Sequence, residues 1–207
     1  MKRKRTATTA NAILGLLALR PSWSTYSITK QLRRNMRFFW PRVESRIYNE
    51  ARQLIARGLV QAFQEHVGRR ARTVYSITSE GQQELEEWLA TAPSATKLEC
   101  EPLLRVFLGD LCTEAQLHAA LAQVRADADA ILSVGRVVGP EYIAGTAPFQ
   151  DQVHVRALVF DFLWNHAKML EQWADRTETT IGQWKQLSPA ERAEAALATI
   201  NRNLETD

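Results

Sequence analysis

The sequence predicts a mainly α-helical protein in two parts: three helices and a two-stranded hairpin, followed by an all-helical second half. Hydrophobic residues recur at helical spacing in successive segments, and two strand-like runs interrupt them between residues 59 and 77. The charge also changes sign along the chain. Residues 1–78 carry 16 basic and three acidic residues, a net charge of +13, whereas residues 79–207 carry 10 basic and 20 acidic residues, a net charge of −10. This asymmetry indicates two functional units.

The basic half is expected to face a polyanion. An excess of +13 over residues 1–78 is costly in self-repulsion unless a polyanion relieves it. The alternative is a basic surface that is evenly solvated and has no partner.

Three helical patterns follow one another between residues 7 and 57. The first ends at residues 20–22, where an arginine, a proline and a serine break its apolar stripe. Ile28 and Leu32 are spaced four residues apart and anchor a short second helix. Pro41 is expected to open the third, because proline suits a first helical turn.

The third helix has two chemically distinct sides. Its apolar side chains fall on one side at 3.6-residue spacing, and arginine, serine, asparagine and glutamine side chains project opposite them. Arginine can bind guanine O6 and N7, asparagine or glutamine can pair with adenine, and serine suits phosphates. The face therefore has the chemistry for a major groove of DNA, although an ordinary amphipathic surface helix explains this pattern equally well when it is taken alone.

A hairpin follows this helix. Gly58 ends the helix, residues 59–63 read as a strand, residues 67–72 as a turn rich in glycine and arginine, and residues 73–77 as the return strand. A helix with a polar face followed by such a hairpin is a winged helix-turn-helix, whose wing arginines bind phosphates or the minor groove. We expect DNA contacts from the second helix, the third helix and the wing: Lys30, Arg42, Ser45, Arg46, Tyr48, Asn49, Arg52, Gln53, Arg69, Arg70 and Arg72.

Residues 78–81 close the hairpin and begin a fourth helix, and the chain leaves it through residues 91–93. We therefore place a DNA-binding domain at residues 1–92 and a helical domain at residues 93–207.

The first of these domains resembles the winged helix of the PadR family of bacterial transcriptional regulators. The resemblance lies in FWPRVESRIYNEARQLIARGLV (residues 39–60) and VGRRARTVYSITSEGQQELEEWL (residues 67–89). The shared positions are Tyr26, Phe39 to Pro41, Ile47, Tyr48, Leu54, Gly58 to Val60, the wing arginines, Tyr75, Thr78 and Gly81. Two positions depart from the family pattern: Thr25 stands where glycine is common, and Ala71 where proline is frequent. Both concern loop stiffness rather than a group that faces DNA.

The resemblance implies a sequence-specific transcriptional regulator, and commonly a repressor. Such a regulator binds a pseudo-palindromic operator as a homodimer and is released by a small aromatic or hydrophobic effector. The second half resembles the subgroup with an extended helical C-terminal domain, through pattern and length more than through motifs.

The second half itself predicts two long helices. Thr113 to Gln116 form a capping box that opens a helix ending near Gly135 and Gly139-Pro140. A later helix carries a heptad seam. Its members are Phe160, Leu163, Ala167, Leu170, Ala174, Thr177, Ile181 and Trp184. This seam requires a partner helix, either the 113–134 helix of the same chain or a second subunit, and we expect it to form the homodimer because apolar residues beside it, such as Phe162, would otherwise be exposed.

Trp164 and Trp173 lie off the seam and offer flat aromatic surface for an effector pocket, with ordinary core packing as the favoured alternative. Residues 188–204 read as a short alanine-rich helix of open role.

Other function classes have little support. The four histidines are scattered, no nucleophile or phosphate-loop motif occurs, and Cys100 and Cys112 have no metal-ligand spacing. We therefore expect no catalytic site, no metal and no cofactor. The sequence has neither a secretory cleavage pattern nor an apolar run of membrane-spanning length, so we expect a cytoplasmic protein without a membrane partner. Two non-enzymatic alternatives stay open: a winged-helix adaptor for RNA or an acidic protein, and a helical protein that sequesters an aromatic compound.

Overall fold

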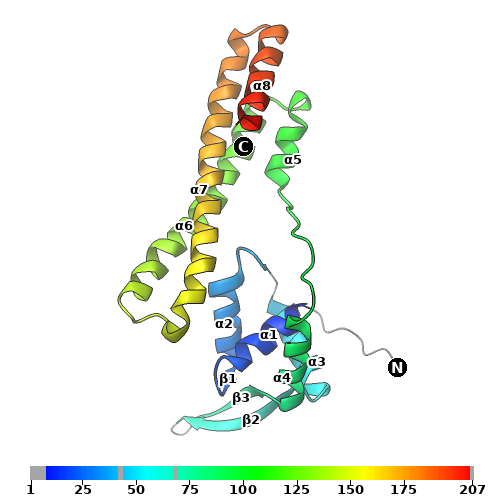
Figure 1. Cartoon of the computed structure of the whole chain (residues 1–207), viewed down its shortest axis with the longest axis vertical. Helices are drawn as coiled ribbons and strands as arrows, with labels where there is room; N and C mark the ends of the chain where they lie inside the picture. The colour runs from blue at the N-terminus through cyan, green and yellow to red at the C-terminus, as the bar shows by residue number, and fades with distance from the viewer. Residues whose placement is uncertain (1–7, 42–43, 68–69, 206–207) are drawn as a thin grey trace, which may run out of the picture. The chain divides into compact units, whose positions relative to one another are not determined.

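The computed structural model describes residues 8–41, 44–67 and 70–205. The chain divides into two compact units, residues 1–96 and residues 97–207, which are described separately (Figure 1).

The first unit has the predicted winged-helix fold. Its elements are α1 (Thr8–Ala18), β1 (Trp23–Ser24), α2 (Thr25–Met36), α3 (Glu44–Ala56), β2 (Val60–Val67), β3 (Arg70–Ile77) and α4 (Ser79–Leu89). The strands form one antiparallel sheet in the order β1-β3-β2. Helix α1 is the centre of the unit because it packs against α3, α4 and β3. Its side chains Ile13, Leu14 and Leu17 are fully buried, together with Leu54 of α3 and Val74 of β3.

Three details of this unit differ from the sequence-based expectation. A third strand, β1, joins the sheet through the pairing of Trp23 with Tyr75, and its two residues are too few to show any periodicity. Helix α3 is described from Glu44 onward, and Pro41 is not helical. The hairpin strands are longer than expected and reach Val67 and Arg70, because cross-strand side-chain pairs extend the ladder beyond the apolar residues.

The start of α4 lies against the turn that follows α3. The hydroxyl of Thr78 accepts a hydrogen bond from the Gly81 backbone N–H (3.1 Å) and donates one to the Gly58 carbonyl (2.8 Å). Gly58 has a positive φ of 72°, which favours glycine. At Gly81 a Cβ would lie 2.1 Å from the carbonyl oxygen of Leu59, so the close approach of α4 requires a glycine there.

The second unit is entirely helical over its described residues. Its α-helices are α5 (Glu101–Phe107), α6 (Glu114–Ile143), α7 (Val153–Gln183) and α8 (Pro189–Leu204). Helices α6 and α7 lie side by side as a long antiparallel hairpin (Figure 1). The predicted capping box is present at Thr113, and the predicted cap at Ser188 is also a capping box; each hydroxyl accepts a hydrogen bond from a backbone N–H three residues later.

Helix α6 passes Gly135 and Gly139-Pro140, where the sequence predicted its end, and continues to Ile143. The reason is tertiary. A Cβ at Gly135 would lie 3.0 Å from the ring of Trp164, and a Cβ at Gly139 would lie 3.5 Å from Phe160. These two aromatic rings of α7 stack on each other, with centroids 5.7 Å apart. The glycines therefore form a surface on which the α7 aromatic side chains pack, and this contact offsets the low helix propensity of glycine.

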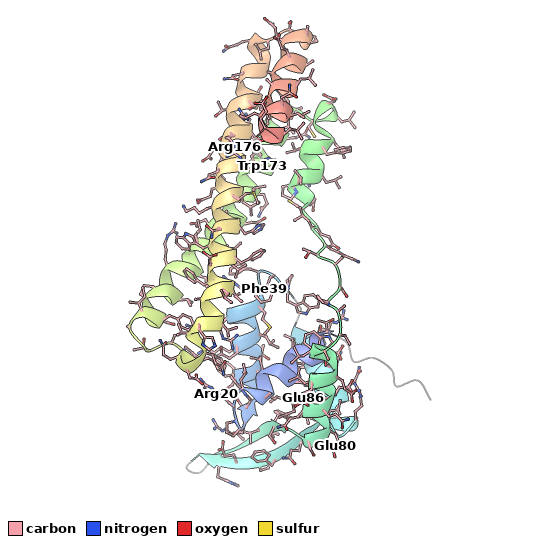
Figure 2. The ribbon with its side chains drawn as sticks, viewed as in Figure 1. Arg20, Phe39, Glu80, Glu86, Trp173 and Arg176 are labelled. Atoms are coloured by element: carbon pink, nitrogen blue, oxygen red, sulfur yellow. The ribbon has the colours of Figure 1, made fainter. Side chains whose placement is uncertain are left out.

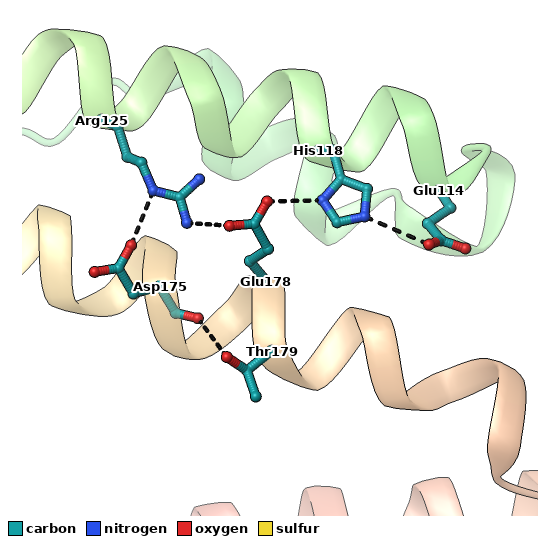
Figure 3. Close-up of polar contacts among 6 residues, drawn as sticks. All are labelled: Glu114, His118, Arg125, Asp175, Glu178 and Thr179. Atoms are coloured by element: carbon teal, nitrogen blue, oxygen red, sulfur yellow. Dashed lines mark hydrogen bonds and ion pairs between the residues drawn. The ribbon is translucent and has the colours of Figure 1, made fainter.

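Charged side chains join the two long helices along one edge (Figure 3). Arg125 of α6 donates hydrogen bonds to Asp175 (2.9 Å) and to Glu178, both on α7. The hydrogen bond to Asp175, followed by that to Glu178, raises the pKa of the Arg125 guanidinium. The Nδ1 atom of His118 lies 3.1 Å from Glu178, and its Nε2 atom lies 3.5 Å from Glu114. Because these groups are partly exposed, they fix the register of the hairpin more than they stabilise it.

Within the described part of the chain, none of the helices combines the length and the apolar character needed to cross a membrane.

Candidate nucleic-acid interface

Helix α3 presents a continuous polar face to solvent. Ile47 and Leu54 are buried against the rest of the unit, whereas Ala51 is half-buried and Ile55 lies at the exposed margin of the apolar side. The side chains on the opposite side are all exposed: Ser45, Arg46, Tyr48, Asn49, Arg52 and Gln53. The helix therefore offers two guanidinium groups and two amides on one rigid surface, which is the donor and acceptor set that base edges in a major groove require.

The beginning of α2 adds a second element to this surface. The helix is capped by Ser24, whose hydroxyl accepts a hydrogen bond from the Ser27 backbone N–H (3.2 Å). Lys30 is exposed and lies over the ring of Tyr26, 6.0 Å from its centroid. Tyr26 is 72% exposed, although tyrosine normally buries its ring. A capped helix start, a lysine and a phenol hydroxyl together suit phosphate oxygens.

Tyr26 was not among the DNA contacts predicted from the sequence. Tyr26 is one of the positions shared with the family pattern. However, a tyrosine two and three residues before buried Ile28 and Thr29 fits a core position equally well. Only its exposure in the folded unit identifies it as a surface group.

The wing arginines are placed unequally. Arg72 lies in β3 and not in the turn, and its Nε donates a hydrogen bond to the Glu65 carboxylate of β2 (2.7 Å). Arg70 begins β3, but its side chain is not described. Arg69 and Arg42 lie outside the described residues. Of the arginines predicted for the wing, the described one is therefore already paired.

The predicted seam of α7 has a partner inside the chain. Ala174 and Ile181 are buried in one cluster with Leu117, Leu121 and Val124 of α6. Ala167 is buried in a second cluster, whose other buried members lie on α6. Leu170 packs against both clusters. The remaining seam residues are half-buried: Phe160, Leu163, Thr177 and Trp184. Of the two partners that the sequence left open, α6 covers the seam, so burial of these residues does not require a second subunit.

Trp164 and Trp173 take part in the same packing. Trp164 packs against the Ala167 cluster and Trp173 against the Ala174 cluster, and both rings are half-buried. Their contacts are those of core packing, the alternative that the sequence favoured over an effector pocket.

A different set of apolar residues is exposed on the second unit. We call Val155, Leu158, Phe162 and Met169 the α7 stripe, because their spacing places them on one side of that helix. Further exposed apolar side chains belong to α5, to the 3-10 turn that follows it and to α8: Leu104, Phe107, Leu111, Leu197, Ile200 and Leu204. Every residue of α8 is exposed. An isolated helix of this length is marginally stable in water, so an apolar partner for α8 is expected.

Within the ranges that the structure describes, no three histidine, cysteine, aspartate or glutamate side chains gather closely enough to hold a metal ion.

Comparison with known proteins agrees with this description. Residues 13–87 match the transcriptional regulator PadR-like family. This confirms the resemblance seen in the sequence of the first unit. No match was found among curated proteins.

Solved structures with the same fold extend the similarity over most of the chain. The structure of Bacillus subtilis PadR in complex with operator DNA is similar with a TM-score of 0.69 and 22% identity, over 84% of this chain and 99% of that chain. A PadR-like transcriptional regulator from Bacillus cereus has a TM-score of 0.71 and 19% identity, over 84% and 98% of the two chains. The Vibrio cholerae virulence activator AphA has a TM-score of 0.65 and 20% identity, over 85% and 99%.

Proposed function

We propose that this chain, whose residues 13–87 match the transcriptional regulator PadR-like family, binds a pseudo-palindromic DNA operator as a homodimer and represses transcription. Both the family and the fold are those of transcriptional regulators, which are not enzymes. The observation that carries the proposal is the polar face of α3, where Arg46, Asn49 and Gln53 are exposed together beside buried Ile47. A regulator of this kind acts where the chromosome lies, which supports a cytoplasmic location.

The proposal is tested by a fluorescence-anisotropy titration at two salt concentrations. The duplex upstream of the protein's own gene is compared with a scrambled duplex of equal composition. We expect a preference of roughly a hundredfold or more for the native duplex, because specific protein–DNA complexes exceed non-specific ones by at least that factor. Equal binding with a strong salt dependence would contradict the proposal and favour an adaptor for RNA or an acidic protein.

Arg46→Ala and Asn49→Ala should each weaken binding to the native duplex by about 1–3 kcal/mol and relax the sequence preference, because each removes a base-edge contact. The same titration measures both effects. Arg176→Ala is a matched control, since Arg176 is an exposed arginine on α7 whose loss changes the net charge equally. If both α3 variants kept the wild-type affinity, α3 would not be the element that reads the bases.

Glu65→Gln should strengthen binding to every duplex alike, by about threefold at ~0.1 M salt, and should steepen the salt dependence. The physical reason is the pair between Arg72 and Glu65, which holds the arginine charge away from phosphates. Removing the carboxylate charge releases Arg72 as a phosphate ligand. A change confined to the native duplex would instead mean that Glu65 takes part in reading the sequence.

The homodimer is proposed to form through the second unit. Its support is the exposed apolar side chains of the α7 stripe, α5 and α8, because exposed apolar residues that gather on a surface mark sites of association. Phe160 and Leu163, two of the eight seam residues that the sequence predicted for the dimer, are half-buried and border the α7 stripe by sequence.

A small aromatic or hydrophobic effector completes the proposal. The Bacillus subtilis PadR structure in complex with p-coumaric acid shows a relative of the same fold with such a compound, at 22% identity and a TM-score of 0.64. In this chain the half-buried rings of Trp164 and Trp173 provide aromatic surface for a ligand of that kind, and their fluorescence would report its binding.

A further inference from the structure

Glu84 is a nearly buried acid in the first unit that has no place in the DNA-facing surface. It lies on α4 and is 8% exposed, beside buried Leu85. Its carboxylate forms an ion pair with the guanidinium of Arg57 at 3.3 Å. Arg57 is the residue that directly follows α3. The pair therefore joins the C-terminal end of the proposed recognition helix to α4.

The same turn is held by α4 at two further points. The Thr78 hydroxyl donates a hydrogen bond to the Gly58 carbonyl, and the Thr78 backbone N–H donates one to the Leu59 carbonyl at 3.2 Å. Gly81 lies directly against that Leu59 carbonyl. Residues 57–59 thus meet α4 through one ion pair, two hydrogen bonds and one close backbone approach.

We propose that Glu84 is a positioning residue for DNA recognition: through Arg57 it fixes the C-terminal end of α3 against α4 and so sets how the polar face of α3 meets a duplex. This inference rests on the proposed function. Helix α4 is also the element from which residues 90–100 lead along the chain to the second unit.

An ion pair suits this role better than an apolar contact would. A charge this deeply buried is stable only with its partner, so the two side chains accept few relative arrangements. An apolar contact would allow the two helices to slide past each other, because the hydrophobic effect is not directional. The pair therefore fixes an orientation between α3 and α4, whereas the buried side chains of α1 provide the cohesion of the unit.

The test uses the full chain with Glu84→Gln, which keeps the shape of the side chain and removes its charge. Glu86→Gln is the matched control, because Glu86 is exposed on the same helix (Figure 2). Circular dichroism checks that both variants are folded. Two readouts follow: hydrogen exchange of the Arg57, Gly58 and Leu59 amides, which donate to carbonyls of α3, and anisotropy with the native and scrambled duplexes.

In Glu84→Gln we expect about tenfold faster exchange at these amides and about tenfold weaker binding of the native duplex, with scrambled-duplex binding unchanged or slightly tighter. A weaker affinity for the native duplex would distinguish a positioning role from a simple charge effect, because removing a negative charge from a DNA-binding unit should by itself strengthen binding. Arg57→Gln should increase the exchange rate of these amides by the same factor. The double variant should exchange no faster, and bind the native duplex no more weakly, than either single variant.

Unchanged exchange in Glu84→Gln would overturn the inference, and so would faster exchange with an unchanged duplex preference. Additive effects in the double variant would also overturn it, because Glu84 would then act independently of Arg57. A wild-type chain with no duplex preference would overturn the proposed function instead, and the exchange readout would still report whether Glu84 holds the end of α3.

Discussion

Replacing Leu121 with aspartate should unfold the second unit. Leu121 is 0% exposed and lies in the cluster that α6 forms with Ala174 and Ile181 of α7. An unpaired carboxylate there has neither solvent nor a partner, so we expect a loss of more than about 4 kcal/mol in the free energy of unfolding. Denaturant unfolding followed by circular dichroism measures the change, and most of the α6–α7 helical signal should disappear.

Leu158→Asp is the matched control for this prediction. Leu158 lies on the α7 stripe and is 71% exposed, so its replacement should leave the hairpin folded. It should instead shift the protein from dimer to monomer in sedimentation experiments. A folded Leu121→Asp variant would contradict the intrachain packing of α6 on α7, and a Leu158→Asp variant that still sediments as a dimer would remove the α7 stripe from the proposed interface.

The packing of α6 on α7 also changes the expected effect of a charge at Leu170. From the seam alone, Leu170 is a dimer contact. Because Leu170 packs against both intrachain clusters, a charge there is now expected to destabilise the hairpin and not merely to separate two subunits.

Gly81→Ala should destabilise the first unit by about 3 kcal/mol. The new Cβ would lie 2.1 Å from the Leu59 carbonyl oxygen and 2.8 Å from a side-chain carbon of Ile77. Since the first of these atoms is backbone, the strain can be relieved only by moving α4 away from the turn after α3. Thermal unfolding measures the loss, and operator binding measured below the unfolding transition should weaken as well.

Gly15→Ala is the control within the same unit. Among the residues that the structure describes, none outside the adjoining turns of α1 places an atom within 4 Å of a Cβ at Gly15. Alanine there should stabilise the protein by about 0.5–1 kcal/mol, because it reduces the conformational freedom of the unfolded chain. If Gly81→Ala behaved like Gly15→Ala, the close approach of α4 to Leu59 would not exist in solution.

Much of the first unit followed from local sequence signals. The hairpin could be placed because Gly58 ends a helical pattern and strand-like runs follow it, and the polar face of α3 follows from its 3.6-residue period. Signals of this kind report the conformation of a segment and the side it buries. They do not report ion pairs between segments, so the pairing of Arg72 with Glu65 and of Arg57 with Glu84 was not foreseen.

The sequence by itself determined the two-part architecture, the net positive charge of the first unit, the resemblance of its winged helix to the PadR-like family and the apolar seam of α7. Only the tertiary structure decided that α6 covers this seam, that α6 continues past Gly135, and that Glu84 meets the end of α3. The reason is physical. Periodicity and composition specify which surface must leave water, and hydrophobic burial is not directional, so the partner that covers the surface is selected by shape and by charges brought together from distant parts of the chain.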